Sequence, residues 1–200
     1  MNPTATSLQR ICVFTGSRPG ARDAYGEAAR SLGRTLVRRG IGLVYGGGNV
    51  GLMGELADAA LAEGGEVIGV IPESLVRKEV AHEGLSQLRV VGSMHERKAQ
   101  MADLADAFIA LPGGMGTLEE LFEILTWAQL GLHGKPSGLL DVGGYFAPLL
   151  ELLDHAVGEG FIQQRHRSLL LHSTSADELL TAFAHHRPTT TAPLIDRESS

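Results

Sequence analysis

A glycine-rich segment that ends in two carboxylates is the part of this chain best equipped for chemistry. Residues 112–120 read Pro-Gly-Gly-Met-Gly-Thr-Leu-Glu-Glu and follow an apolar run over residues 107–111. The run predicts a buried strand, and Thr117 is predicted to open an amphipathic helix. Free amides and the helix dipole point at one place in such a loop, which predicts an anion site. Glu120, in the first helical turn, then favours a phosphorylated substrate that is cut nearby.

The same residues also fit a purely structural role. Thr117-Leu118-Glu119-Glu120 matches a capping box, in which Thr117 is the N-cap and Glu120 reaches back to it. A cap does not need three glycines ahead of it, so the prefix favours the anion site. Both interpretations stay open at this point.

A basic doublet forms the second cluster. Residues 94–101 read Met-His-Glu-Arg-Lys-Ala-Gln-Met, so Met94, Arg97 or Lys98, and Met101 share one helical face. One interpretation is a surface helix whose arginine lies beside core methionines. The other is a cation at a purine or phosphate site.

Two more glycine turns precede these clusters. Residues 16–20 read Gly-Ser-Arg-Pro-Gly, and residues 45–54 contain five glycines in ten positions. The first turn lacks the dinucleotide fingerprint, and no acidic residue ends the second strand, which argues against NAD. The second turn lacks the Gly-Lys-Ser/Thr of a Walker A loop, which disfavours ATP hydrolysis. Its excess of glycine indicates close approach of a ligand or another backbone.

Strand-like and helix-like segments alternate along the chain, which predicts an α/β protein: a parallel sheet with helices on both faces. In such sheets ligands bind outside the carboxyl ends of the strands, where the three glycine turns fall. We expect a flexible N-terminus over 1–9, one Rossmann-like domain over 10–186 and a disordered tail over 187–200. The expected strands cover 11–15, 41–45, 67–71, 88–91, 107–111, 137–140 and 168–171, and the expected helices cover 23–39, 51–63, 94–104, 117–130, 146–158 and 176–185.

Composition excludes several classes of protein. The net charge of −6 argues against a general nucleic-acid partner. No apolar run reaches the roughly 20 residues of a membrane span, and the first residues lack a signal-peptide core. The single cysteine, Cys12, forms no intrachain disulfide, which fits a reducing cytoplasm. The histidines show no metal spacing, so we predict neither a metal nor a cofactor.

Taken together, Met94-x-x-Arg97-Lys98-x-x-Met101 and Pro112-Gly-Gly-x-Gly-Thr-x-x-Glu120 resemble the LONELY GUY family. The resemblance runs from about residue 11 to 183 and includes the motifs at 45–48, 51–54, 69–72 and 126–127. The family's usual opening is Cys-Gly-Ser-Ser, whereas this chain has Thr15-Gly16-Ser17-Arg18, so Arg18 is expected to change phosphate contacts there.

This resemblance implies a three-layer modified Rossmann fold and assembly as homodimers or larger homo-oligomers. It implies cleavage of N6-modified adenosine 5′-monophosphates to the free base, a cytokinin, and ribose 5-phosphate. By position, Arg97 and Glu120 match the catalytic pair, and Thr126 is expected to serve a neighbouring subunit's site. Together with the glycine turns, the expected substrate-binding residues are Gly16, Ser17, Gly47, Gly48, Glu79, Met94, Arg97, Lys98, Gly114, Met115, Gly116, Thr117, Leu118, Glu119, Glu120 and Thr126.

As a hypothesis, Glu120 stabilises the oxocarbenium-like sugar or activates water, and Arg97 stabilises the leaving base or orients the ribose. Two alternatives remain: a general nucleosidase acting on plain AMP, and a non-catalytic nucleotide or molybdenum-cofactor carrier. The family's older label, lysine decarboxylase, needs a pyridoxal-phosphate lysine, and none of the three lysines lies in a recognisable cofactor context.

Overall fold

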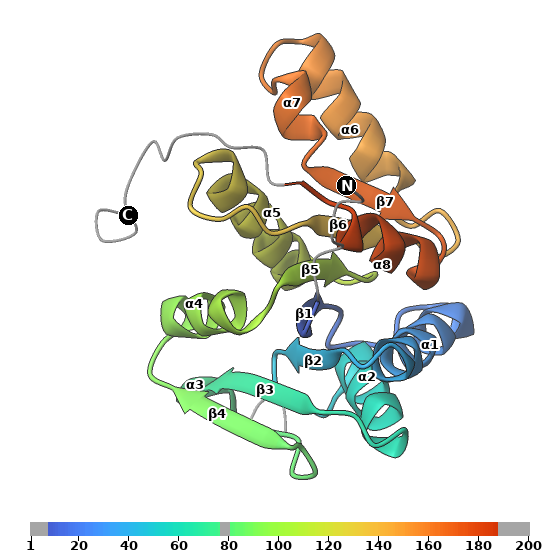
Figure 1. The fold of residues 1–200 in the computed structure, drawn as a ribbon, viewed down its shortest axis with the longest axis vertical. Coiled ribbons are helices and arrows are strands. Elements are labelled where there is room, and N and C mark those ends of the chain that lie inside the picture. The colour runs from blue at the N-terminus through green and yellow to red at the C-terminus, as the bar shows by residue number, and fades with distance from the viewer. Residues whose placement is uncertain (1–7, 77–80, 188–200) are drawn as a thin grey trace, which may run out of the picture.

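A parallel sheet forms the centre of the molecule. The structure, a computed structural model, describes residues 8–76 and 81–187. Within these ranges it has seven strands in the order β4-β3-β2-β1-β5-β6-β7, each parallel to its neighbours (Figure 1). The strands are β1 Arg10–Phe14, β2 Gly42–Tyr45, β3 Val67–Pro72, β4 Gln87–Val91, β5 Ala107–Ala110, β6 Ser137–Leu140 and β7 Leu170–Ser173. This confirms the predicted α/β class.

Helices cover both faces of this sheet and complete three layers. Figure 1 shows α1, α2 and α8 on one side of the sheet, and α4 and α5 on the other. The helices are α1 Asp23–Arg38, α2 Gly51–Ala62, α3 Glu73–Val76, α4 Met94–Leu104, α5 Met115–Gln129, α6 Ala147–Gly158, α7 Gln164–Arg167 and α8 Ala176–Ala184. Strands buried on both faces lose the polar alternation of half-exposed strands and read as continuous apolar runs.

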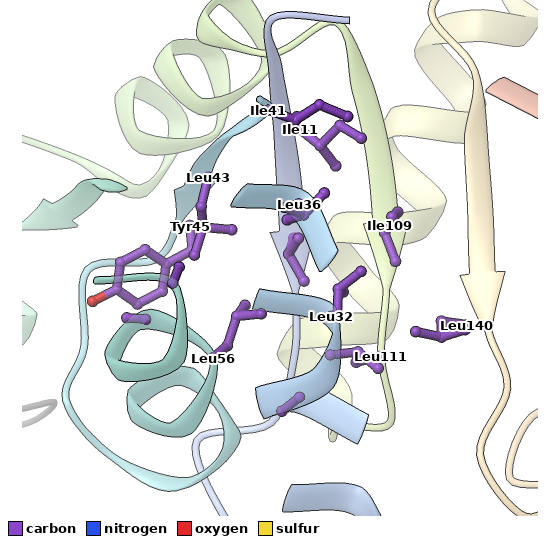
Figure 2. Packing of buried hydrophobic residues seen from close by; sticks show 14 of the residues in the cluster. Ile11, Leu32, Leu36, Ile41, Leu43, Tyr45, Leu56, Ile109, Leu111 and Leu140 are labelled. Atoms are coloured by element: carbon purple, nitrogen blue, oxygen red, sulfur yellow. The ribbon is translucent and has the colours of Figure 1, made fainter. Parts of the chain in front are cut away.

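Alternate residues of β1 belong to two different cores. Ile11 and Val13 pack with apolar side chains of α1, α2 and α8. Figure 2 shows part of this core, where Leu32 and Leu36 of α1 lie over the sheet. Cys12 and Phe14 belong instead to the core beneath α4, α5 and α6. A side chain is therefore assigned to one face of the sheet by its position in the strand.

The order of the strands reverses at β1. The chain moves from β1 outward to β2, β3 and β4, then returns through α4 to β5 on the opposite side of β1. Ligands of open parallel sheets bind at such a reversal, outside the carboxyl ends of the strands. The turns that follow β1, β2 and β5 are the three glycine turns of the sequence.

Most predicted elements agree closely with the observed ones, and two differ. The helix expected from Thr117 begins at Met115, and the last strand is β7 rather than residues 168–171. The expected flexible N-terminus and tail fall largely on residues 1–7 and 188–200, which lie outside the described residues.

Candidate active site

Backbone hydrogen bonds join the three glycine turns. The Gly16 N–H donates to the Pro112 carbonyl at 3.2 Å, which ties the turn after β1 to the turn after β5. The Leu52 N–H, at the start of α2, donates to the Gly16 carbonyl at 3.0 Å. The turns after β1 and β5 thus lie side by side, and the glycine-rich stretch 45–54 reaches them through Leu52.

A pocket of about 330 Å³ opens beside the joined turns. Gly16 and Ser17 form one wall, and Gly113 and Gly114 form another. The pocket is completed by Arg18, Gly20, Tyr25, Leu52, Pro112 and Tyr145. Arg18, one of the two residues that depart from the expected family opening, thus lines this pocket and is exposed.

The start of α5 corrects the capping-box interpretation. Gly114 is the N-cap, with extended backbone and no side-chain cap, and the Leu118 N–H donates to its carbonyl at 3.1 Å. Thr117 is therefore the third residue of the helix, and Glu120 lies in the second turn rather than the first. Glycine is an acceptable N-cap by itself, so the helix starts before the threonine that the sequence pattern favoured.

Thr117 packs against the glycine loop instead of capping the helix. Its side chain is buried, with 4% of the residue exposed. A Cβ atom added to Gly113 would lie 2.1 Å from the Thr117 Oγ1 and 2.9 Å from the Gly16 nitrogen. Gly113 is thus a position where only glycine leaves room for the neighbouring turn and helix.

Arg97 is buried at the carboxyl ends of β2 and β3. Only 5% of the residue is exposed. Its Nε donates to the Val70 carbonyl at 3.1 Å and its Nη2 donates to the Gly46 carbonyl at 3.1 Å. The interpretation of a surface arginine beside core methionines is therefore wrong for Arg97. A buried guanidinium with two backbone acceptors is held in one orientation, as a group that binds or stabilises charge must be.

Gly46 is one site residue that sequence reasoning missed. A Cβ atom at this position would lie 2.1 Å from the Arg97 Nη2. The absence of a side chain at Gly46 therefore makes the space that the guanidinium fills. The excess of glycine in this turn was the available signal, but a sequence does not say which glycine faces which partner.

The neighbouring glycines hold the segment that contains Ala81 and His82. The Gly47 carbonyl accepts from the His82 N–H at 3.0 Å, and Gly48 pairs with Ala81. The His82 ring is in turn 2.9 Å from Asp58 of α2. Glu79, an expected substrate-binding residue, lies outside the described residues.

The charges of Glu120 and Arg97 both affect the pKa of the Cys12 thiol. Burial raises the pKa of Cys12, the negative charge of Glu120 raises it further, and the positive charge of Arg97 opposes the shift. Cys12 points to the face of β1 that α4 and α5 cover. Arg97 on α4 and Glu120 on α5 thus belong to the two helices that cover this face, and Glu120 is half-buried.

Comparison with known proteins decides the family. A family model described as "possible lysine decarboxylase" matches residues 53–183. Cytokinin riboside 5′-monophosphate phosphoribohydrolase LOG of Oryza sativa subsp. japonica is 52% identical over 181 residues, which cover 90% of this chain and 75% of that protein. Cytokinin riboside 5′-monophosphate phosphoribohydrolase LOG7 of Arabidopsis thaliana is 50% identical over 188 residues, which cover 94% and 87%. The chain belongs to the LOG family.

A solved structure extends the likeness in fold beyond the LOG family. The molybdenum cofactor binding protein of Rippkaea orientalis superposes with a TM-score of 0.65 at 23% identity, covering 89% of this chain and 98% of that one. At this level of identity the likeness concerns the fold alone. A shared fold does not determine function, which has to be argued from the site.

Lys98 of this LOG-family chain connects two helices. Its Nζ lies 2.6 Å from Glu119 Oε1 and 2.8 Å from Glu123 Oε1, and 10% of its side chain is exposed. Lys98 belongs to α4 and both carboxylates belong to α5. Burial lowers the pKa of Lys98, but the hydrogen bonds and charges of Glu119 and Glu123 outweigh it, and the net shift is upward.

The raised pKa gives the Lys98 link a defined pH dependence. A pKa that is higher in the folded state stabilises the fold below the ordinary value of 10.5, and this stabilisation is lost as pH rises through the folded pKa. We therefore expect wild type to have a larger free energy of unfolding than Lys98→Met at about pH 8. This difference should shrink at about pH 11. Urea unfolding at both pH values measures it, and an unchanged difference contradicts the link.

Other expected binding residues of the LOG family occupy different surroundings. Gly114, Met115 and Gly116 are exposed at the start of α5, and Leu118 is half-buried against the core beneath it. Thr126 is exposed and its Oγ1 donates to the Phe122 carbonyl of the preceding turn at 2.7 Å. Thr126 is thus separated from the glycine loop by most of the length of α5.

The described part of the chain shows no group of three or more histidine, cysteine, aspartate or glutamate side chains placed to hold a metal ion. None of its helices has the length and apolar character needed to cross a membrane.

Proposed function

We propose that this LOG-family chain is an N-glycosyl hydrolase that cleaves N6-modified adenosine 5′-monophosphates into the free base, a cytokinin, and ribose 5-phosphate. The observation that carries the proposal is that buried Arg97 on α4 and half-buried Glu120 on α5 belong to the two helices that cover one face of β1, with Glu120 on the helix that the glycine loop opens. Binding alone does not require such a pair. Relatives that carry the name of this activity are about half identical over nine-tenths of the chain, which supports the same assignment.

Glu120 is proposed to act at the sugar. Cleavage of an N-glycosidic bond passes through an oxocarbenium-like sugar, and a carboxylate near the anomeric carbon stabilises that cation or activates the attacking water. The second turn of α5 places the carboxylate beyond the loop amides rather than among them. One bound nucleotide can then have its phosphate at the loop amides and its sugar at Glu120.

Arg97 is proposed to act at the leaving base. The purine gains negative charge as the bond breaks, and a fixed cation in a buried site stabilises that charge without reorganising. The hydrogen bonds to Val70 and Gly46 fix the guanidinium before the substrate arrives.

The glycine loop is proposed to hold the 5′-phosphate. Nothing lies within 4 Å of a Cβ atom added to Gly114 or Gly116, so both glycines face open space. Amides at a helix N-terminus attract anions there. A fixed phosphate also fixes the ribose against Glu120. Such positioning of the reacting groups accounts for a large part of enzymatic rate enhancement.

The remaining contacts are proposals taken from the glycine turns, from the basic cluster at 94–101 and from the family resemblance. Gly16, Ser17, Gly47, Gly48, Glu79, Met94, Lys98, Met115, Leu118 and Glu119 are assigned to substrate binding on this basis. Exposed Thr126 is assigned to the site of a neighbouring subunit, which requires a homodimer or a larger homo-oligomer. We infer a cytoplasmic enzyme, because its single cysteine is buried as a free thiol.

Lysine decarboxylation does not fit the lysines that the structure describes. Lys98 is ion-paired to two carboxylates, and the Lys135 Nζ donates to the Ala102 carbonyl at 2.7 Å. A Schiff-base lysine needs an available amine. Lys78 lies outside the described residues.

Product analysis tests the proposal. Purified protein is incubated with isopentenyladenosine 5′-monophosphate, with AMP and with the dephosphorylated riboside, and the products are separated by HPLC. Isopentenyladenine from the monophosphate alone is the expected result. Faster release of adenine from AMP indicates a general nucleosidase instead. Ligand recovered intact from all three incubations indicates a carrier and contradicts catalysis.

A further inference from the structure

Two consecutive glycines place Tyr145 beside the glycine loop. Gly143 and Gly144, after β6, have φ of 62° and 76°, a conformation that side chains other than glycine's rarely allow. The Arg22 Nη1 donates to the Gly143 carbonyl at 3.2 Å, and the Phe146 N–H donates to Asp141 Oδ1 at 2.9 Å. The backbone on both sides of Tyr145 is thereby fixed.

Aromatic contacts fix the ring of Tyr145 as well. The ring meets Tyr25 edge-on, with centroids 5.9 Å apart and planes at 78°, and meets Phe146 edge-on at 5.0 Å and 85°. Edge-to-face pairs of this kind are preferred over face-to-face stacking. Its hydroxyl donates to the Gly113 carbonyl, so a rigid side chain from the turn after β6 holds the loop after β5.

The peptide that Tyr145 holds joins two glycines. In a trans peptide the carbonyl oxygen and the following N–H point in opposite directions. The Gly113 carbonyl points at Tyr145, so the Gly114 N–H points away from it. A peptide between two glycines meets little steric resistance to rotation as a unit. Rotation by half a turn would place a carbonyl oxygen where the N–H now lies, and would repel an anion.

We propose that Tyr145 is a positioning residue that locks the Gly113–Gly114 peptide with its N–H directed away from the Tyr145 ring, toward the 5′-phosphate. This rests on the proposed function, in which the loop amides bind that phosphate. Gly114 is also the N-cap of α5, and its carbonyl accepts the first helical hydrogen bond from Leu118. The lock therefore orients both the loop and the helix that carries Glu120.

Tyr145→Phe tests the lock, with Thr181→Ala as the matched control. Each substitution removes one hydroxyl that donates to a backbone carbonyl: that of Tyr145 donates to Gly113, and that of exposed Thr181, on α8, donates to Asp177 at 2.7 Å. We expect Tyr145→Phe to weaken ribose 5-phosphate binding about 5-fold by calorimetry, the size of one lost hydrogen bond. The KM for the monophosphate substrate rises by a similar factor, and kcat falls less. Thr181→Ala leaves these quantities near wild type.

Amide exchange gives a readout that needs no ligand. The Leu118 N–H, bonded to Gly114, is expected to exchange about 5-fold faster in Tyr145→Phe than in wild type or Thr181→Ala, as measured by NMR. Equal exchange and equal affinity for ribose 5-phosphate in Tyr145→Phe and wild type overturn the proposal. If the proposed function fails but the lock is real, wild-type protein releases no base from the monophosphate. Tyr145→Phe then still changes the exchange rate of the Leu118 N–H and the affinity for ribose 5-phosphate.

Discussion

Replacing Glu120 with glutamine is expected to lower turnover by at least about 100-fold, with little change in KM for the monophosphate. Glutamine keeps the shape of the side chain and removes its charge, so the sugar cation loses its stabilising carboxylate. Because α5 begins at Met115, Glu120 has no capping duty at the helix N-terminus. The helix should therefore form normally in this variant.

Steady-state kinetics with isopentenyladenosine 5′-monophosphate measures the effect, and thermal unfolding checks the fold. Glu123→Gln is the matched control, because it removes a carboxylate from the same helix while Lys98 keeps its second partner, Glu119. The control should retain most of the turnover. Turnover near wild type in Glu120→Gln would remove Glu120 from the mechanism.

Gly46→Ala is expected to lower turnover on the order of 100-fold, the cost of displacing a catalytic group by about 1 Å. The added Cβ would lie 2.1 Å from the Arg97 Nη2, so the guanidinium has to move. It then leaves its position between the Gly46 and Val70 carbonyls. Turnover should fall although the substitution adds only one methyl group and removes no functional group.

A double-mutant cycle identifies the cause of that loss. If Gly46→Ala acts by displacing Arg97, adding it to Arg97→Ala should cost little more than Arg97→Ala alone. Additive losses would mean that Gly46 acts by another route. Gly158→Ala is the control for a glycine without close neighbours, since nothing lies within 4 Å of its added Cβ at the end of α6. It should leave turnover unchanged.

The fold was largely predictable because the inner strands of this sheet are buried on both faces. Apolar runs such as residues 107–111 mark the strands directly, and the glycine turns mark their carboxyl ends. The start of α5 was not predictable from a capping pattern. The same pattern occurs at Ser93 and Glu96, where Ser93 Oγ does accept from the Glu96 N–H at 3.1 Å and Glu96 reaches back to the Gly92 N–H. Short cap patterns do not distinguish a helix start from an early helical turn.

The candidate site was predictable in its residue types and not in its contacts. Spacing placed Arg97 on a helical face, but its buried position involves the Val70 carbonyl of β3 and the missing side chain at Gly46. Tyr145 gave no signal, because it is far from the loop in sequence and reaches it only through the fold. Long-range hydrogen bonds of this kind follow from topology rather than from local pattern.

Each of the two charged doublets, Arg97-Lys98 and Glu119-Glu120, combines a proposed catalytic residue with a member of an ion pair. Successive helical residues point about 100° apart, so the side chain of each proposed catalytic residue leaves its helix in a different direction from that of its neighbour in the doublet. The ion pair of Lys98 with Glu119 therefore lies one residue away from each proposed catalytic group. This ion pair joins α4 to α5, the helices that carry Arg97 and Glu120, and it therefore helps to set the distance between those two side chains. A substitution that lengthens or weakens the ion pair between Lys98 and Glu119 would therefore change turnover without altering Arg97 or Glu120.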